Sequence, residues 1–336
     1  MSRVLNWKGL TRPWFSDCPT SMMSIDPVVA FFLLGLLGGR MGSDLKLSSG
    51  LYDTLTIYLL LAIGLKGGFE LAQSSVGALV IPVLVVVAAS AVTPVLAYQV
   101  LRRGGKLAHP DAASISAHYG SVSVVTYAVG STYLAQQAVD HDGYMSIFLV
   151  FLEFPAIIIG VLLARGMKRD TEWRELAKEV LFGKAIVLLL GALVIGWVWG
   201  REGAASLIPF FEGLFKGFLA LFLLGMGVMA ANRLEDLKRV GGFLIAFGIL
   251  IPLLSAVGGV LVGWGLGLGE GNTTLLAVLY ASASYIAAPA AMRIVIPEAN
   301  PALSLGASLG VTFPFNLVLG IPAYHWMTKQ FFLWIS

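Results

Sequence analysis

The sequence predicts an all-α, polytopic membrane protein whose ten transmembrane helices form two inverted five-helix repeats. Three observations predict this fold: the composition, the spacing of the apolar segments and an internal repeat. Of the 336 residues, 57% are hydrophobic and only 12% are charged. A soluble domain carries about twice that charged fraction. A soluble core could not bury so much apolar surface, so lipid must act as part of the solvent.

The same composition argues against several classes of function. The formal net charge of +3 is too small to indicate a nucleic-acid partner, and basic membrane loops explain it better. Cys18 is the only cysteine, so neither an intramolecular disulfide nor a thiolate metal site can form. The sequence contains no hydrolase, metalloprotease or nucleotide-binding motif. We therefore expect no enzyme, no cofactor and no ATP-driven pump; any transport would use an ion gradient or the solute's own gradient.

Ten apolar segments approach the length of about 20 residues that a helix needs to cross the hydrocarbon core. The fourth and the ninth are the least apolar, because they are rich in Ser, Ala, Tyr and Gly. The predicted spans are 27–42, 51–69, 76–101, 112–136 and 143–165 in the first half, and 183–200, 205–232, 241–266, 273–296 and 305–328 in the second.

Loop charges predict the orientation of these spans. With ten spans, 15 of the 22 Lys and Arg residues fall in the odd-numbered loops, for example Arg233, Lys238 and Arg239 in a predicted loop after the seventh span. By the positive-inside rule the odd loops are cytoplasmic and both termini are extracytoplasmic.

The same pattern divides the chain into four parts. Residues 1–26 are predicted to form an extracytoplasmic tail, and 27–165 the first five-helix repeat. Residues 166–182 are charged and amphipathic, which predicts a short cytoplasmic linker helix. Residues 183–336 form the second predicted repeat.

Short motifs recur between spans numbered n and n+5. Tyr119-Gly-Ser-Val-Ser123 in the fourth span is echoed by Tyr280-Ala-Ser-Ala-Ser284 in the ninth, 161 positions later. The near-constant offset indicates a duplication. Because five is odd, the second copy enters the membrane from the opposite side, as in many alternating-access transporters. Two further pairs are Gly64 with Gly225, 161 apart, and Phe154-Pro155 with Phe313-Pro314, 159 apart.

Small residues at helix-packing spacing occur in several spans. Gly35 and Gly39 form one such pair, and Gly196 and Gly200 another. This spacing lets helix backbones approach closely in lipid. We expect packing within the chain, with an oligomer interface as the alternative.

The fourth and ninth spans are the candidate binding site, since inverted-repeat folds bind solutes where corresponding helices are interrupted. Both carry hydroxyls where lipid-facing helices carry Leu or Val, and the ninth contains Pro289. A broken helix exposes N–H groups and a positive dipole end to an anion. Its free carbonyls, with Ser hydroxyls, suit Na⁺.

Each of these residues also has a structural interpretation. A serine in a membrane helix often bonds only to its own i−4 carbonyl, although pairing across the repeat favours function for Ser121 with Ser282. Glu153 is an ionisable group inside a span, which is usually functional; a helix–helix hydrogen bond or salt bridge is its alternative. His118 is expected to be a neutral packing residue, with a proton relay as the alternative.

Several segments together resemble the sodium-dependent bicarbonate transporter family. They are HYGSVSVVTYAVGSTYL at 118–134, LEFPAIIIGVLLAR at 152–165, SASYIAAPAAMRIVIPEANP at 282–301, SLGVTFPFNLVLGIP at 308–322 and GLKGG at 64–68. The resemblance covers the chain from the first helix to the last. It implies a symporter that imports bicarbonate with Na⁺ across a bacterial inner membrane, as a homotrimer of inverted five-helix repeats. A soluble cytoplasmic regulator is a further partner that the family implies.

The resemblance also implies the site residues. The predicted substrate-binding residues are Gly120, Ser121, Ser123, Thr126, Ser282, Ser284 and Tyr285, and the predicted Na⁺ ligands are Ser123, Glu153 and Ser284.

The chain departs from the cyanobacterial pattern of that family beside both serine clusters. Tyr285, Ala287 and Ala288 stand where the pattern has an acidic residue and small polar residues, and Val124 and Val125 replace small or hydroxylic residues. Both changes remove potential Na⁺ ligands. The open alternatives are transport of another small anion or carboxylate with different ion coupling, a passive permease or channel, and a membrane scaffold that binds a partner.

Overall fold

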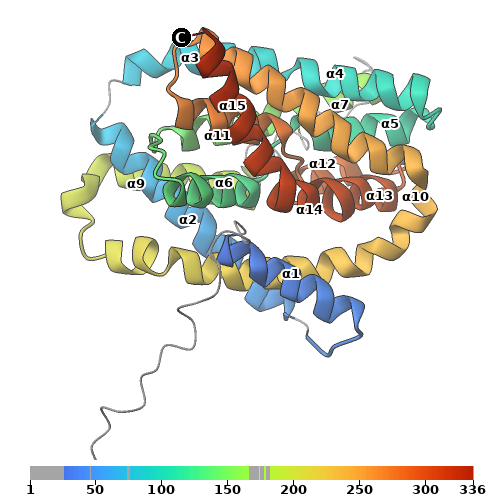
Figure 1. Cartoon of the computed structure of the whole chain (residues 1–336), viewed down its shortest axis with the longest axis horizontal. Helices are drawn as coiled ribbons and strands as arrows, with labels where there is room; N and C mark the ends of the chain where they lie inside the picture. The colour runs from blue at the N-terminus through green and yellow to red at the C-terminus, as the bar shows by residue number, and fades with distance from the viewer. Residues whose placement is uncertain are drawn as a thin grey trace, which may run out of the picture.

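The computed structural model describes residues 26–45, 47–73, 76–165, 174, 178 and 182–335. The predicted tail 1–26 and linker 166–182 therefore lie almost wholly outside the described residues. All the regular secondary structure in the described ranges is helical, which confirms the predicted all-α class (Figure 1).

Within each half, the described helices follow one another with short connections. In the first half they are α1 (Pro27–Arg40), α2 (Ser49–Gln73), α3 (Val76–Ser90), α4 (Val92–Gln99), the π-helical turn η2 (Val100–Gly104), α5 (His109–Gly120), α6 (Val124–Gln136) and α7 (Met145–Arg165). In the second half they are α9 (Lys184–Gly203), η3 (Pro209–Gly213), α10 (Phe215–Gly265), α11 (Glu270–Ala281), α12 (Ala287–Val295), α13 (Pro301–Leu305), η4 (Gly306–Thr312), α14 (Phe313–Phe315), η5 (Asn316–Gly320) and α15 (Ile321–Ile335).

Seven described helical segments are long and apolar enough to cross a membrane, judged by length and composition. The predicted span 27–42 corresponds to α1, a shorter apolar helix of 14 residues. The predicted spans 112–136 and 273–296 are each divided between two short helices, α5 with α6 and α11 with α12. The helical membrane fold is confirmed, and the count of ten crossings stays a prediction. The seven segments are Ser49–Gln73, Gly77–Gly104, Met145–Arg165, Lys184–Gly203, Phe215–Arg233, Gly241–Gly265 and Pro301–Ile335.

The seventh and eighth predicted spans are two arms of one long helix, α10. The prediction of a loop around Arg233, Lys238 and Arg239 is wrong, because the backbone stays helical there and leaves helical geometry at Gly241, with φ 76° and ψ 159°. Leu, Glu, Lys and Arg in this segment are good helix formers, and glycine accepts the positive φ. Figure 1 shows α10 bending back so that its arms run along opposite edges of the molecule.

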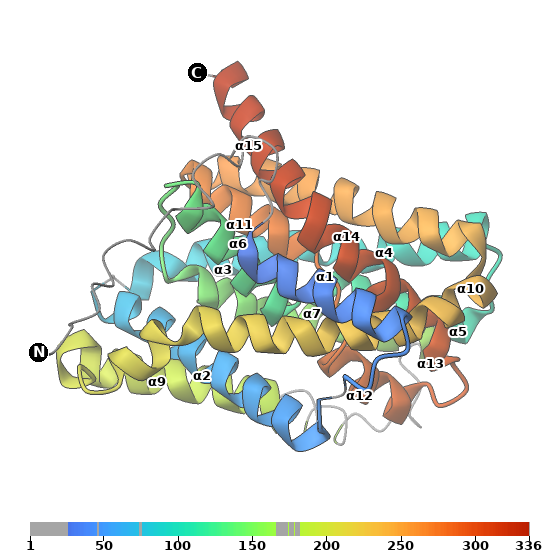
Figure 2. The same cartoon turned by 60° about the horizontal axis from the view of Figure 1, so that its bottom comes forward.

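Glycines bring two helix pairs into close contact. α1 packs along the first arm of α10, and α2 along α9; both pairs lie side by side in Figures 1 and 2. A Cβ on Gly196 would lie 2.5 Å from the Leu65 carbonyl oxygen, and a Cβ on Gly35 would collide with the Leu224 carbonyl oxygen. The expected packing role within the chain is thus confirmed for both glycines, but it is wrong for Gly200, where an added Cβ would meet no atom of a described residue within 4 Å.

The outer surface of the bundle is apolar. Ile81 on α3 is 70% exposed, and Leu254 on the second arm of α10 is 65% exposed. Serines, by contrast, are buried inside the bundle, among them Ser121 and Ser282 at 1% exposure each. This inversion of the usual soluble pattern places lipid around the helices and directs the polar groups to the interior.

Candidate functional site

The fourth predicted span is interrupted by its serine motif. α5 ends at Gly120, Ser121 and Ser123 adopt extended backbone angles, and α6 begins at Val124. The Ser123 Oγ accepts hydrogen bonds from the Thr126 N–H at 3.2 Å and from the Thr126 hydroxyl at 2.9 Å. Serine favours this capping position because it satisfies a first-turn amide that has no acceptor inside the helix. The predicted interruption is confirmed.

The ninth predicted span is interrupted in the same way. α11 ends one residue before the extended Ser282, and α12 begins at Ala287. The Ser284 Oγ accepts a hydrogen bond from the Ala288 N–H at 3.3 Å. Pro289 lies within the first turn of α12 rather than at the break, and a proline there disturbs no intrahelical bond. The serines therefore mark the break better than the proline.

The two breaks are hydrogen-bonded to each other. The Ser123 N–H donates to the Ser282 Oγ at 2.9 Å. The Ser284 N–H donates to the His118 carbonyl oxygen at 2.9 Å, and the His118 Nδ1 donates to the Ser284 carbonyl oxygen at 2.7 Å. All four residues are buried. Two motifs 161 positions apart in sequence thus meet inside the bundle.

Polar side chains from the last predicted span hold the ends of α5 and α11. The Asn316 Nδ2 donates to the Ala281 carbonyl oxygen at 2.9 Å, and the Tyr324 hydroxyl donates to the Asn316 Oδ1 at 2.6 Å. The Tyr119 hydroxyl is hydrogen-bonded to the Thr312 hydroxyl at 2.7 Å. A carbonyl in the last turn of a helix receives no hydrogen bond from within that helix. Asn316 therefore donates to a buried carbonyl oxygen, that of Ala281, which the break leaves unpaired.

A small cavity lies where the breaks face α2 and α10. It leaves about 20 Å³ for the centre of a water-sized sphere, which is room for a single water molecule or a small ion. Its polar lining consists of Thr56, Ser123, Glu153, Ser284 and Tyr285, and its apolar lining of Leu59, Leu60, Val122, Val124, Val125, Ala185, Phe222 and Ile286.

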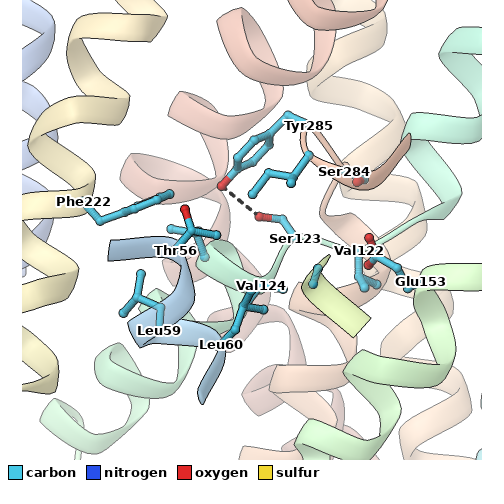
Figure 3. A pocket seen from close by; sticks show the side chains of 13 residues that line it. Thr56, Leu59, Leu60, Val122, Ser123, Val124, Glu153, Phe222, Ser284 and Tyr285 are labelled. Atoms are coloured by element: carbon cyan, nitrogen blue, oxygen red, sulfur yellow. Dashed lines mark hydrogen bonds between the residues drawn. The ribbon is translucent and has the colours of Figure 1, made fainter. Parts of the chain in front are cut away.

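The polar groups of this cavity form two sets (Figure 3). The hydroxyls of Thr56, Ser123 and Tyr285 point toward one another, and the Ser123 hydroxyl donates to the Tyr285 hydroxyl oxygen at 3.3 Å. The Glu153 carboxyl lies apart from these hydroxyls, on the side of Ser284. The first set offers donors to an anion, and the second offers the oxygen ligands that hard cations prefer.

Four helix ends meet at the two breaks: the N-termini of α6 and α12 and the C-termini of α5 and α11. A helix N-terminus carries a partial positive charge and unpaired amides, and a C-terminus carries a partial negative charge and unpaired carbonyls. Val124, Val125 and Ile286 line the cavity, so the N-terminal ends of α6 and α12 form part of its wall. An anion and a cation can each face a helix end of opposite sign.

The structure brings all the predicted site residues together, in two layers. Gly120 belongs to the outer layer: a Cβ there would lie 2.6 Å from Pro94 and from Ala156, so this glycine packs α5 against α4 and α7. Binding of substrate or Na⁺ by these residues stays a prediction. The cavity is lined by Ser123, Glu153, Ser284 and Tyr285, and supported from behind by Gly120, Ser121, Thr126 and Ser282.

The contribution of α2 and α10 to the cavity was not predicted from the sequence. Thr56 and Phe222 complete the cavity wall from these helices. Thr56 was the detectable signal, since it is a hydroxyl inside an apolar span. Its hydroxyl donates to the Tyr52 carbonyl oxygen at 2.8 Å, the common intrahelical bond that makes such a residue ambiguous in sequence. The expectation that His118 serves packing understates its role, since it joins the two breaks.

The match to a known family covers most of the chain. No match was found among curated proteins. The model of the Na⁺-dependent bicarbonate transporter superfamily matches residues 27–329, from the start of α1 into α15. This is a family of membrane transporters rather than enzymes. The chain is an integral membrane protein that belongs to the Na⁺-dependent bicarbonate transporter superfamily.

Proposed function

We propose that the chain is a secondary transporter that imports a small inorganic anion, bicarbonate, in symport with Na⁺. The observation that carries this proposal is the meeting of the two breaks, where the starts of α6 and α12 and a buried carboxyl line one small cavity. Membership of the superfamily supports both the substrate and the coupling ion.

The anion binds at the hydroxyl side of the cavity. One negative charge in a low-dielectric interior needs several donors. The Tyr285 hydroxyl and the first-turn amides of α6 and α12 supply them, and the Thr56 and Ser123 hydroxyls join when their hydrogens turn away from the Tyr52 carbonyl and the Tyr285 oxygen. Na⁺ binds on the other side, between Glu153 and Ser284, and offsets the anion's charge before the site closes.

The cavity as it stands is too small for bicarbonate, since it holds about one water-sized group. Binding therefore requires the breaks to move relative to α2 and α10, which form the opposite wall. This is the step that an alternating-access transporter needs, with the helices around the breaks moving past a more static scaffold.

Ten crossings with alternating orientation are part of the proposal, and contacts between loops support them. Arg165, at the end of the fifth predicted span, pairs with Glu298 in the ninth loop at 3.1 Å. Asp142, in the fourth loop, accepts a hydrogen bond from Asn272, beside the eighth loop, at 2.6 Å. Odd loops thus contact odd loops and even loops contact even loops, as alternation requires.

The inverted repeat is supported by the helix pairs as well. Gly35 of α1 and Gly196 of α9 are 161 positions apart, the offset of the serine motifs. Each lies at a close backbone approach, α1 to α10 and α9 to α2. If the two halves are exchanged, α1 takes the place of α9 and the first arm of α10 takes the place of α2, so one helix pair maps onto the other.

The remaining parts of the proposal follow from the family and the loop charges. Both termini are extracytoplasmic in a bacterial inner membrane, and three chains form a homotrimer. The linker 166–182 offers a cytoplasmic site for a regulatory protein.

The test is uptake of labelled bicarbonate into liposomes that contain the purified protein, with and without an inward Na⁺ gradient. Saturable uptake that requires the gradient is expected. Saturable uptake that ignores Na⁺ would reject Na⁺ coupling, and uptake that does not saturate would indicate a channel. Uptake of another small anion or carboxylate in place of bicarbonate would reject the substrate.

A further inference from the structure

A second, larger cavity lies between α2, α6, α9 and the start of α10, on the face that carries the loops 137–144 and 204–214. It leaves about 360 Å³ for the centres of water-sized spheres. Lys66, Arg201 and Lys216 line it from three different helices, and Glu212 is the acidic residue among the lining residues. We name this cavity the basic vestibule.

The vestibule keeps a net positive charge after its ion pairs are formed. Arg201 and Glu212 neutralise each other through two hydrogen bonds of 2.8 and 2.7 Å. Lys66 and Lys216 form no salt bridge with any residue that the structure describes. Three carboxylates lie near the vestibule without lining it: Glu70 acts on Arg201, and Asp140 and Asp142 act on His141 together with Lys66. The lining itself therefore carries two ammonium groups that have no salt-bridge partner among the described residues.

The vestibule leads toward the cavity at the breaks. On α2, Leu59 and Leu60 line the small cavity, and Ile63 and Lys66 line the vestibule. On α6, Val125 lines the small cavity and residues 127–135 line the vestibule. One turn of a helix spans about 5.4 Å, so the two spaces are separated by roughly one turn on each of two helices.

We propose that the basic vestibule is an anion-gathering site, in which Lys66 and Lys216 attract small anions from the solvent and deliver them to the site at the breaks; the delivery step rests on the proposed function. A concave surface of one charge sign with low-dielectric walls focuses the field and concentrates counter-ions. The ammonium groups act as point charges on flexible stems, which suits transient capture of an anion rather than tight binding. Their loss lowers the rate of capture without altering the donors at the breaks.

The local potential can be measured without bicarbonate transport. Cys18 is the only cysteine, so a Cys18→Ser background with Ala135→Cys places one thiol on the vestibule wall, where Ala135 lies. In nanodiscs, the modification rates of this thiol by an anionic and by a cationic methanethiosulfonate of similar size are compared. The ratio of the two rates reports the potential. Lys66→Gln with Lys216→Gln should lower the anionic-to-cationic ratio about tenfold.

Two control variants separate the vestibule from general effects. Lys66→Arg keeps the charge and should keep the ratio. Lys329→Gln removes an exposed charge on α15 that does not line the vestibule, and should also keep it. A ratio unchanged in the double variant, or lowered equally by Lys329→Gln, would overturn the proposal.

Transport kinetics then test the delivery step. The double variant should raise the half-saturating bicarbonate concentration about tenfold at low salt, with the maximal rate unchanged and the effect shrinking at high salt. A lowered maximal rate with an unchanged half-saturating concentration would overturn delivery. If bicarbonate is not transported by the wild type at all, the proposed function fails, and the rate ratio still decides whether the vestibule attracts anions.

Discussion

Replacement of Ser282 by Ala removes the acceptor through which the two breaks are joined. The Ser282 Oγ accepts the Ser123 N–H at 2.9 Å and donates to the Leu279 carbonyl oxygen at 2.8 Å. The Ser123 amide would then be left buried without its acceptor, which costs about 1–3 kcal/mol. Because anion binding uses the joined breaks, this corresponds to a rise of about 5- to 150-fold in the half-saturating substrate concentration.

The matched control for this variant is Ser308→Ala. Ser308 is equally buried, but its hydroxyl donates to the Ser304 carbonyl oxygen at 2.8 Å within its own helical segment. Its loss removes a buried hydroxyl without separating the breaks, so we expect less than about a threefold change. Liposome uptake gives the half-saturating concentration, and thermal unfolding in detergent shows that both variants are folded. Equal values for Ser282→Ala and the wild type would refute the claim that this bond organises the site.

Three further predictions concern packing, cation coupling and pH. Gly196→Ala should destabilise the protein by about 1–3 kcal/mol, because it overpacks α9 against α2. Gly191→Ala in the same helix should not, since a Cβ on Gly191 would meet no atom of the described chain within 4 Å. Thermal unfolding of the two variants tests this difference. Glu153→Gln should raise the half-saturating Na⁺ concentration at least about tenfold by removing a charged ligand, and unchanged Na⁺ dependence would contradict its role. Burial, aided by the Lys66 charge, lowers the pKa of His141 from its ordinary value of 6.5. Protonation of His141 therefore disfavours the folded state, and the free energy of unfolding falls as the pH drops below that value. Thermal unfolding of His141→Gln should show a smaller loss of stability over the same pH range.

The sequence was informative where a local pattern has a local cause. A serine at a helix start satisfies free amides, so two serine motifs at a fixed offset predicted both interruptions and most of the residues around them. The length of the apolar segments predicted the long spans, because a helix needs about 20 apolar residues to cross the hydrocarbon core. Tyr285, singled out as a departure from the family pattern, lines the cavity and bonds to Ser123.

Other features depend on tertiary contacts and could not be predicted from the sequence. The segment after Arg233 reads as a charged loop, yet its helix-forming residues continue α10 until Gly241 allows the chain to leave helical geometry. Asn316 caps the end of α11 from 35 positions away, which no short-range pattern reveals. The basic vestibule likewise arises only when Lys66 and Lys216, from separate helices, face one space.

The measurement that tests the account most directly is Na⁺-driven bicarbonate uptake by wild type and by a Ser123→Ala, Ser284→Ala double variant, compared in the same liposomes. Ser123 caps α6, and the Ser284 Oγ accepts the Ala288 N–H in the first turn of α12. Loss of such a cap costs about 1 kcal/mol of stability, and Asn300→Ala, which removes the cap of α13, controls for this. The account predicts that the double variant loses saturable, Na⁺-dependent uptake and Asn300→Ala keeps it. Uptake with unchanged ion dependence in the double variant would contradict the site at the breaks.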